Sequence, residues 1–176
     1  MQIPPPPPAI VQPAQRPSAA TPVYPLAPAL PTDSTLWLNT GGKLAAVAQG
    51  RVTVLTFWTA DCINCKHTLP FWNTWAARFA SASDIAVVSV HTPETRWERS
   101  PNVVRKAIKD HNLHFPVLID NEATVFSAYT VNAWPTTIVI DKHGRIRGKW
   151  EGELNWQNSH EYQRVEQLID KLRGER

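Results

Sequence analysis

Residues 52–70 decide the fold, and they read VTVLTFWTADCINCKHTLP. The first part, residues 52–58, is rich in β-branched and aromatic side chains, which favour a buried β-strand. Apolar residues then recur at helical spacing from Leu69 to Phe79, in a segment that begins near Cys62. The stretch therefore predicts a strand that turns directly into a helix, with two cysteines at the turn.

Strand-like and helix-like segments alternate along the rest of the chain. β-Branched and aliphatic residues predict further strands at residues 85–90, 136–140 and 145–150, the last two joined by the hairpin signal Asp141-Lys142-His143-Gly144. Helical spacing predicts helices around residues 104–111 and 165–172, with a short apolar run at 115–119 between them. The order β-α-β-α-β-β-α predicts an α/β fold in which helices cover both faces of a mixed central sheet.

Residues 1–31 differ in composition from the rest of the chain. They contain most of its 16 prolines and a single charged residue, Arg16. Such Pro/Ala-rich sequence has too few large side chains to form a core and favours the polyproline II conformation. We therefore expect a disordered spacer at residues 1–31 and one domain at residues 32–176, a length typical of a single domain.

The charge and the hydropathy of the chain limit its partners. It carries 18 Lys and Arg against 15 Asp and Glu, and no basic run is interleaved with aromatic residues, which argues against a nucleic-acid partner. No apolar run approaches the roughly 20 residues that cross a bilayer. The start, Met1-Gln2-Ile3 followed by prolines, does not resemble a signal peptide. Two expectations stay open, a cytoplasmic protein and a protein whose leader or anchor is absent from this chain.

Cys62 and Cys65 are the only cysteines. A disulfide between them would close a very short loop and add little chain-entropy stabilisation, so the pair suits reversible redox chemistry better than a structural role. At a helix N-terminus, the unpaired N–H groups and the helix dipole favour a thiolate on Cys62. Cys65, one turn further on, can then attack a mixed disulfide and release the partner. This chemistry needs no cofactor.

Other uses of a CxxC pair make different demands. A zinc ribbon needs a second pair of ligands, and the chain has no further cysteine. Haem attachment needs CxxCH, whereas Lys66 follows the second cysteine and the histidine comes one place later, at His67. Copper stays open, because Cys62, Cys65 and His67 offer two thiolates and an imidazole suited to Cu(I). A copper-binding assembly chaperone is therefore an alternative function.

Residues 57–70 resemble the active-site segment of thioredoxin-like proteins, especially the TlpA/ResA group and the thioredoxin-like domain of DipZ-type cytochrome c biogenesis proteins. Three later stretches also resemble landmarks of the DipZ-type domain: His91-Thr92-Pro93-Glu94, Phe115-Pro116-Val117 and Trp134-Pro135-Thr136. The resemblance covers about residues 36–172. It implies a thioredoxin-like three-layer sandwich and thiol–disulfide exchange in a cell envelope.

The resemblance also implies roles for residues around the cysteines. Pro135 matches the cis-proline that these proteins place beside the disulfide, where the backbone of Trp134 is free to pair with an extended substrate segment. Trp58 and Trp134 are expected to flank the disulfide. Together with Ile63 and Asn64, between the cysteines, they form the expected substrate-binding residues.

The usual proton-handling groups of these families are missing. Thr56 stands where classical thioredoxins have a buried aspartate, and Thr68 stands where ResA-like proteins have a glutamate. Glu94 and Asp61 are the substitutes that the sequence offers for proton transfer to and from Cys65. The ordinary interpretation of each, and the one that the residue type favours, is a solvated carboxylate.

A third class is related by fold. Thr59-Ala60-Asp61-Cys62 fits the TxxC of peroxiredoxins, but Leu55 replaces the proline expected four residues before the threonine. A peroxidase also has no evident need for its second cysteine on the same helix. A thiol peroxidase is therefore the weaker alternative.

The residues around Cys62 indicate a direction for the exchange. Ile63 and Asn64 bring no charge, and Asp61 opposes a thiolate, so the pKa of Cys62 should be lowered only modestly and the potential should be comparatively negative. These features predict a reductase. The resemblance implies the same direction, with a membrane electron donor and with disulfides of apocytochromes or copper-site assembly proteins as partners. It further implies a periplasmic or otherwise extracytoplasmic location, with the full-length protein anchored to the membrane.

Overall fold

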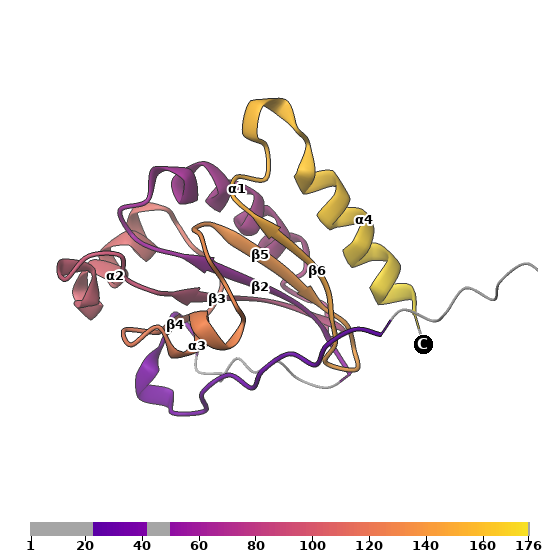
Figure 1. Cartoon of the computed structure of the whole chain (residues 1–176), viewed down its shortest axis with the longest axis horizontal. Coiled ribbons are helices and arrows are strands. Elements are labelled where there is room, and N and C mark those ends of the chain that lie inside the picture. Colours follow the sequence, from indigo (N-terminus) through magenta and orange to yellow (C-terminus); the bar gives the residue numbers. More distant parts are fainter. Residues whose placement is uncertain (1–22, 42–49, 176) are drawn as a thin grey trace, which may run out of the picture.

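The structure is a computed structural model, and it describes residues 23–41 and 50–175 (Figure 1). These residues form a sheet of six strands, in the order β1-β4-β3-β2-β5-β6. The strands are β1 (Trp37–Leu38), β2 (Val52–Trp58), β3 (Ile85–His91), β4 (Val117–Ile119), β5 (Thr136–Ile140) and β6 (Ile146–Glu151). The α-helices are α1 (Ile63–Arg78), α2 (Pro101–Asp110), α3 (Thr124–Ala128) and α4 (Glu161–Gly174). Short 3-10 helices are η1 (Ser34–Leu36), η2 (Trp97–Arg99) and η3 (Trp156–Asn158).

Strand β2 lies inside the sheet, and its pairing makes the sheet mixed. It runs parallel to β3 and antiparallel to β5. Strand β4 continues the parallel part beside β3, and β6 forms the expected hairpin with β5. All of β2 is buried, because an inner strand of a sheet covered on both faces directs no side chain at solvent. The predicted α/β fold with a mixed sheet is confirmed.

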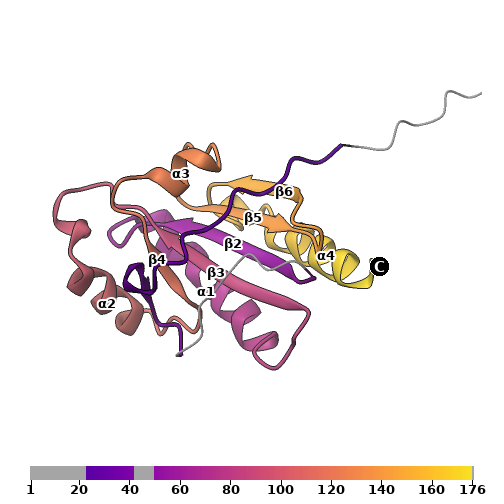
Figure 2. The same ribbon diagram turned by 90° about the horizontal axis from the view of Figure 1, so that it is seen from below.

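Helices cover both faces of the sheet, as the sequence predicts. Figure 2 shows α3 on one side and α1 and α4 on the other. One core cluster joins α1, α2 and α4 to the sheet through side chains such as Trp72, Val104 and Ile169. The second joins α3 and the N-terminal segment to the opposite face, through Val125 and Leu30. None of the described helices has both the length and the apolarity needed to span a membrane.

The structure adds three elements to the expected order. Strand β4 occupies part of the apolar run at 115–119, while β1 and α3 are too short for a hydrophobic period to reveal them. Helix α3 begins where the buried carboxylate of Asp120 accepts hydrogen bonds from the backbone N–H groups of Val125 (3.1 Å) and Phe126 (2.9 Å). A polar contact from the end of β4, rather than an amphipathic pattern, thus fixes this helix.

The boundary expected at residue 31 is wrong, because part of the presumed spacer pairs with the domain. Ala27 N donates to Gly144 O, and Ile146 N donates to Pro25 O, each at 2.8 Å. Leu26 forms an isolated antiparallel bridge with Arg145. These bonds fasten the segment to the start of β6.

Burial strengthens this attachment. Leu30 is 8% exposed and packs in the same cluster as α3. The hydroxyl of Tyr129 donates to Pro28 O at 2.6 Å. Apolar residues spaced among the prolines give the segment enough side-chain area to join the core. The rest of the predicted spacer, residues 1–22, lies outside the described residues.

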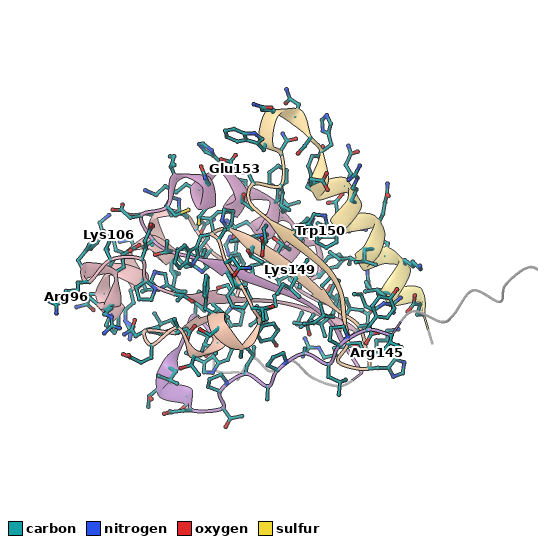
Figure 3. The ribbon with its side chains drawn as sticks, in the orientation of Figure 1. Arg96, Lys106, Arg145, Lys149, Trp150 and Glu153 are labelled. Carbon is teal, nitrogen blue, oxygen red and sulfur yellow. The ribbon has the colours of Figure 1, made fainter. Side chains whose placement is uncertain are left out.

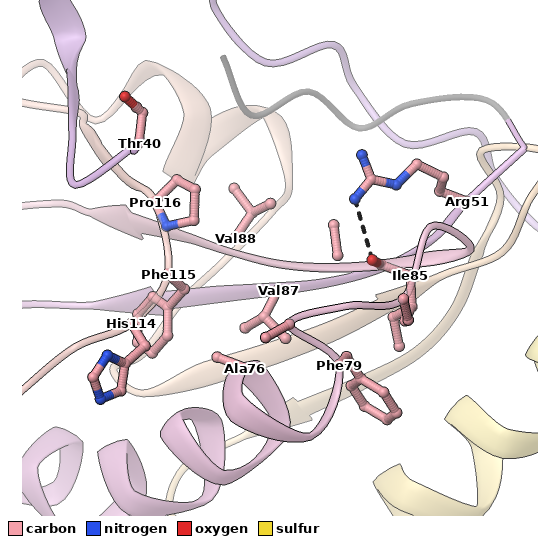
Figure 4. Close-up of a pocket in the computed structure, with 13 residues that line it drawn as sticks. Thr40, Arg51, Ala76, Phe79, Ile85, Val87, Val88, His114, Phe115 and Pro116 are labelled. Atoms are coloured by element: carbon pink, nitrogen blue, oxygen red, sulfur yellow. Dashed lines mark hydrogen bonds between the residues drawn. The ribbon is translucent and has the colours of Figure 1, made fainter. Parts of the chain in front are cut away.

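A cavity of about 230 Å³ lies at the C-terminal end of α1 (Figure 4). Ala76 and Phe79 line it from the helix, and Val87 lines it from β3. Arg51 Nη2 donates to Ile85 O at 3.1 Å at its rim. The two cysteines lie at the other end of α1, so this cavity is separate from them.

Candidate active site

The two cysteines lie where β2 ends and α1 begins. Strand β2 ends at Trp58, a short loop follows, and Cys62 is the N-cap of α1, with extended backbone angles (φ −72°, ψ 116°). Cys65 lies in the first turn of the helix. Cys62 is partly buried, whereas Cys65 is fully buried. The predicted turn from strand to helix, with both cysteines at the helix start, is confirmed.

The first helical turn makes the two thiols unequal in acidity. Cys65 N donates a hydrogen bond to Cys62 Sγ at 3.1 Å. A hydrogen bond from the Cys65 side chain, helped by backbone N–H groups, outweighs burial and lowers the pKa of Cys62 to about 7. Burial raises the pKa of Cys65, and its hydrogen bond to Cys62 raises it further. Cys62 is thus the more exposed and the more acidic thiol, as the sequence predicts.

The pKa of Cys62 sets the pH dependence of exchange. Because the thiolate attacks, the rate with a small disulfide should rise about tenfold per pH unit below about pH 7 and level off above it. Initial rates, measured beside the ultraviolet absorbance of the thiolate, test this. In Cys65→Ala the same titration should move to higher pH, since the hydrogen bond that lowers the pKa most is gone. A wild-type midpoint at the ordinary value of 9.0 would contradict the expectation.

Each of the three residues before the first cysteine is held by a buried ionisable side chain. Ala60 N donates to His91 Nε2 at 3.2 Å, and Asp61 N donates to Glu98 Oε1 at 2.9 Å. Thr59 Oγ1 donates to the same Glu98 oxygen. Both acceptor residues are 0% exposed. Burial lowers the pKa of His91 to about 4, so its neutral ring accepts the hydrogen bond.

The sequence does not predict these two anchors as site residues. His91 ends a buried strand and lies beside Trp58 in the register of β2 and β3. A polar side chain at that end of a buried strand is a signal that could have found it. Glu98 lies in η2, and no local pattern distinguishes it from the exposed glutamates of the chain.

Trp58 lies under the site rather than on its surface. It is 1% exposed, and its ring packs edge-on against His91 with centroids 5.1 Å apart. Its Nε1 donates to Ser89 Oγ at 3.3 Å. As the last residue of a strand covered on both faces, it belongs to the same buried cluster as Cys65. The prediction that Trp58 binds substrate is therefore wrong for this structure, and its place is a support beneath the cysteines.

The other expected substrate-binding residues lie at the surface or half-buried. The Trp134–Pro135 peptide bond is cis, as the resemblance implies. Trp134 is half-buried and packs with Cys62 against the first core cluster. Ile63 is 60% exposed, and Asn64 is also exposed. Their role in binding stays a prediction.

The two carboxylates expected to move protons differ in their relation to the thiols. The Asp61 side chain is 62% exposed, and its Oδ1 lies 3.7 Å from Lys66 Nζ. The pKa of Cys62 is lowered most by its hydrogen bond with Cys65, and the negative charge of Glu94 works against that shift. Burial raises the pKa of Cys65 most, and the charge of Glu94 adds to it. Glu94 is thus the carboxylate whose charge reaches both thiols.

His67 is engaged elsewhere. Its Nδ1 lies 3.1 Å from Oε1 of Glu153, which Figure 3 shows in the connection between β6 and α4. Within residues 23–41 and 50–175, no three His, Cys, Asp or Glu side chains are grouped so that they could hold a metal ion. The structure does not bring Cys62, Cys65 and His67 together as the copper alternative requires.

Thioredoxin-like thiol–disulfide oxidoreductases carry such a cysteine pair on such a sheet, and this is the class that the fold and the site define. Residues 35–149 match the model of the AhpC/TSA family, and the chain belongs to that family.

Relatives agree with the resemblance to the TlpA/ResA group. DipZ of Mycobacterium tuberculosis is 33% identical over 116 residues, which cover 64% of this chain and 16% of DipZ. The thiol–disulfide oxidoreductase ResA of Bacillus subtilis is 27% identical over 126 residues, 70% of this chain and 67% of ResA. A putative thiol:disulfide interchange protein DsbE from Chlorobium tepidum superposes with a TM-score of 0.69 at 22% identity, over 86% of this chain and 97% of the other. The chain thus spans only 16% of the DipZ proteins that it matches.

Proposed function

We propose that this domain reduces protein disulfides, with Cys62 as the attacking thiol and Cys65 as the resolving thiol. The observation that carries the proposal is the inequality of the pair. A partly exposed thiol with a pKa of about 7 caps α1, and a fully buried thiol donates to it from the first turn of that helix. Such a pair attacks a disulfide through one sulfur and completes the reaction through the other.

The reaction proceeds in two exchanges. The Cys62 thiolate attacks one sulfur of the substrate disulfide, forms a mixed disulfide and displaces the other substrate sulfur as a thiolate, which takes up a proton. Cys65 then loses its proton and attacks Cys62 Sγ. This step forms the Cys62–Cys65 disulfide and releases the second substrate thiol. Two electrons pass from the cysteine pair to the substrate, and a dithiol donor restores the pair by the reverse sequence.

The buried thiol of Cys65 needs a proton acceptor before it can attack. We assign this role to Glu94, because its charge reaches both thiols, whereas the exposed carboxylate of Asp61 lies beside Lys66. Glu94 is exposed, so its carboxylate can take the proton and pass it to solvent.

The environment of Thr59 favours exchange over peroxide reduction. This threonine, the first residue of the TxxC pattern, is 1% exposed. Its hydroxyl donates to the buried Glu98, so it is turned away from an incoming substrate. The second thiol lies in the first turn of the same helix, where it can resolve a mixed disulfide directly.

The relatives support a proposal for the partners and the location. We infer that the substrates are disulfides of apocytochromes or of copper-site assembly proteins, and that a membrane protein supplies the electrons. An extracytoplasmic location with a membrane anchor in the full-length protein fits these partners. This inference is supported by the similarity to DipZ and ResA.

The reduction potential of the Cys62/Cys65 pair tests the direction. We expect a value at or below about −200 mV, compared with about −120 mV for the strong oxidant DsbA. The measurement equilibrates the domain with defined ratios of a reduced and oxidised dithiol and follows the cysteine oxidation state by mass. Cys65→Ser, which cannot form the internal disulfide, is the matched control. A value close to that of DsbA would mean that the domain oxidises its partners instead.

A further inference from the structure

Glu98 is a buried carboxylate in the connection between β3 and α2. Its side chain belongs to the single-turn helix η2 and is 0% exposed. Among the described residues, it forms no ion pair with a lysine or an arginine. Burying an unpaired carboxylate is costly unless hydrogen bonds replace its lost hydration.

Hydrogen bonds from two separate loops surround this carboxylate. Oε1 accepts from Thr59 Oγ1 and from Asp61 N, which belong to the loop before the first cysteine. Oε2 accepts from Glu94 N at 3.1 Å, and from Thr95 N and Thr95 Oγ1 at 2.9 Å each. One oxygen thus serves the cysteine loop, and the other serves the loop that carries Glu94.

These hydrogen bonds keep Glu98 ionised. Burial acts to raise its pKa, but the hydrogen bonds from Thr59, Asp61 and Thr95 outweigh it and hold the pKa below the usual range. An ionised carboxylate offers acceptor sites on both oxygens, whereas a glutamine replaces one oxygen with a donor. Only an acid can therefore accept from both loops at once.

We infer that Glu98 is a positioning residue for disulfide exchange. It fastens the loop before Cys62 to the loop that carries Glu94, and so fixes the position of Glu94 relative to the two thiols. His91 supports the first loop independently through Ala60 N. The inference rests on the proposed function, because it assigns Glu98 a part in the reaction of that same cysteine pair.

The test is a double-mutant cycle between Glu94 and Glu98, read out as the pKa of Cys62. Because the negative charge of Glu94 opposes the thiolate, Glu94→Gln alone should lower the pKa of Cys62. In the Glu98→Gln background, the glutamine amide must turn its donor either towards Asp61 N or towards Glu94 N and Thr95 N, so the two loops are no longer held together. The shift caused by Glu94→Gln should then shrink by at least about half. Thiolate absorbance against pH measures all four variants.

Exchange kinetics supply a second readout. Glu98→Gln should slow the reduction of a small disulfide by about tenfold, the scale expected when reacting groups lose their mutual orientation. Glu122→Gln is the matched control, since this carboxylate is 77% exposed and, within the part of the chain that the structure describes, forms an ion pair with Arg99 alone, at 3.5 Å. It should change neither the rate nor the pKa of Cys62.

A milder variant keeps the test decisive if Glu98→Gln does not fold. Thr95 is exposed, and Thr95→Val removes only its hydroxyl bond to Oε2. The effect of Glu94→Gln on the pKa of Cys62 should be smaller in this background than in the wild type. Equal shifts in every background, or no shift from Glu94→Gln in the wild type, would overturn the inference. The pKa needs no protein substrate, so a wild type that reduces no disulfide would refute the proposed function while leaving this coupling measurable.

Discussion

Replacing Cys62 by serine should abolish disulfide exchange, with a fall in rate of at least about a thousandfold, because a serine hydroxyl supplies no nucleophile at neutral pH. Replacing Cys65 by serine should have a different result. Cys62 can still attack, but nothing resolves the product, so a mixed disulfide with the partner should accumulate. The covalent complexes can be counted by non-reducing electrophoresis and by intact mass.

The pair of variants makes this expectation decisive. Cys62 is the partly exposed N-cap of α1, and Cys65 is fully buried behind it. If partners were instead captured by Cys65 in the Cys62→Ser protein, the assignment of attacking and resolving thiols would be reversed. Addition of a reductant should release every trapped partner, which controls for non-covalent association.

A large loss of stability is expected when Trp72, which joins α1 to the sheet, is truncated. Its side chain is 0% exposed, and its Nε1 donates to Thr137 Oγ1 in β5 at 3.0 Å. Trp72→Ala removes this packing and leaves a cavity, so the free energy of unfolding should fall by about 3–5 kcal/mol. Unfolding in urea measures the change.

Trp156 offers a control of the same residue type. It is 58% exposed in η3, so Trp156→Ala should change the free energy of unfolding by no more than about 0.5 kcal/mol. Similar losses in both variants would show that burial is not what makes Trp72 stabilising. An altered dependence on urea concentration would instead indicate a change in the unfolded state.

The sequence predicts the cysteine end of the domain well because the signals there are local. The change from strand to helix period and the position of Cys62 are visible within residues 52–70. The hairpin of β5 and β6 is equally local, since its turn residues lie between two apolar runs. Strand β1 and helix α3 lack such signals, because they have only two and five residues, and α3 is fixed by hydrogen bonds to the carboxylate of Asp120 rather than by an amphipathic pattern.

The residues that anchor the site cannot be predicted from the sequence for a related reason. Glu98 contacts Asp61 across 37 positions of chain, and its burial is decided by loops whose course no pattern reveals. Trp58 shows the opposite error. Its place beside the cysteines in the sequence suggests surface contact with a partner, whereas the end of an inner strand buries it. Proximity along the chain therefore predicts which residues react, but not how deeply the side chains beside them are buried.

The attachment of the N-terminal segment to β6 also affects how copies of the chain can associate. An edge strand presents unpaired backbone groups, and a second copy can add to them to build a continuous intermolecular sheet. Here Pro25, Leu26 and Ala27 occupy the start of that edge. Prolines in this segment have no N–H to offer, so it does not extend the ladder as a regular strand would. The same contacts that enlarge the domain thus protect its sheet from self-association, and loss of this segment should expose the molecule to aggregation.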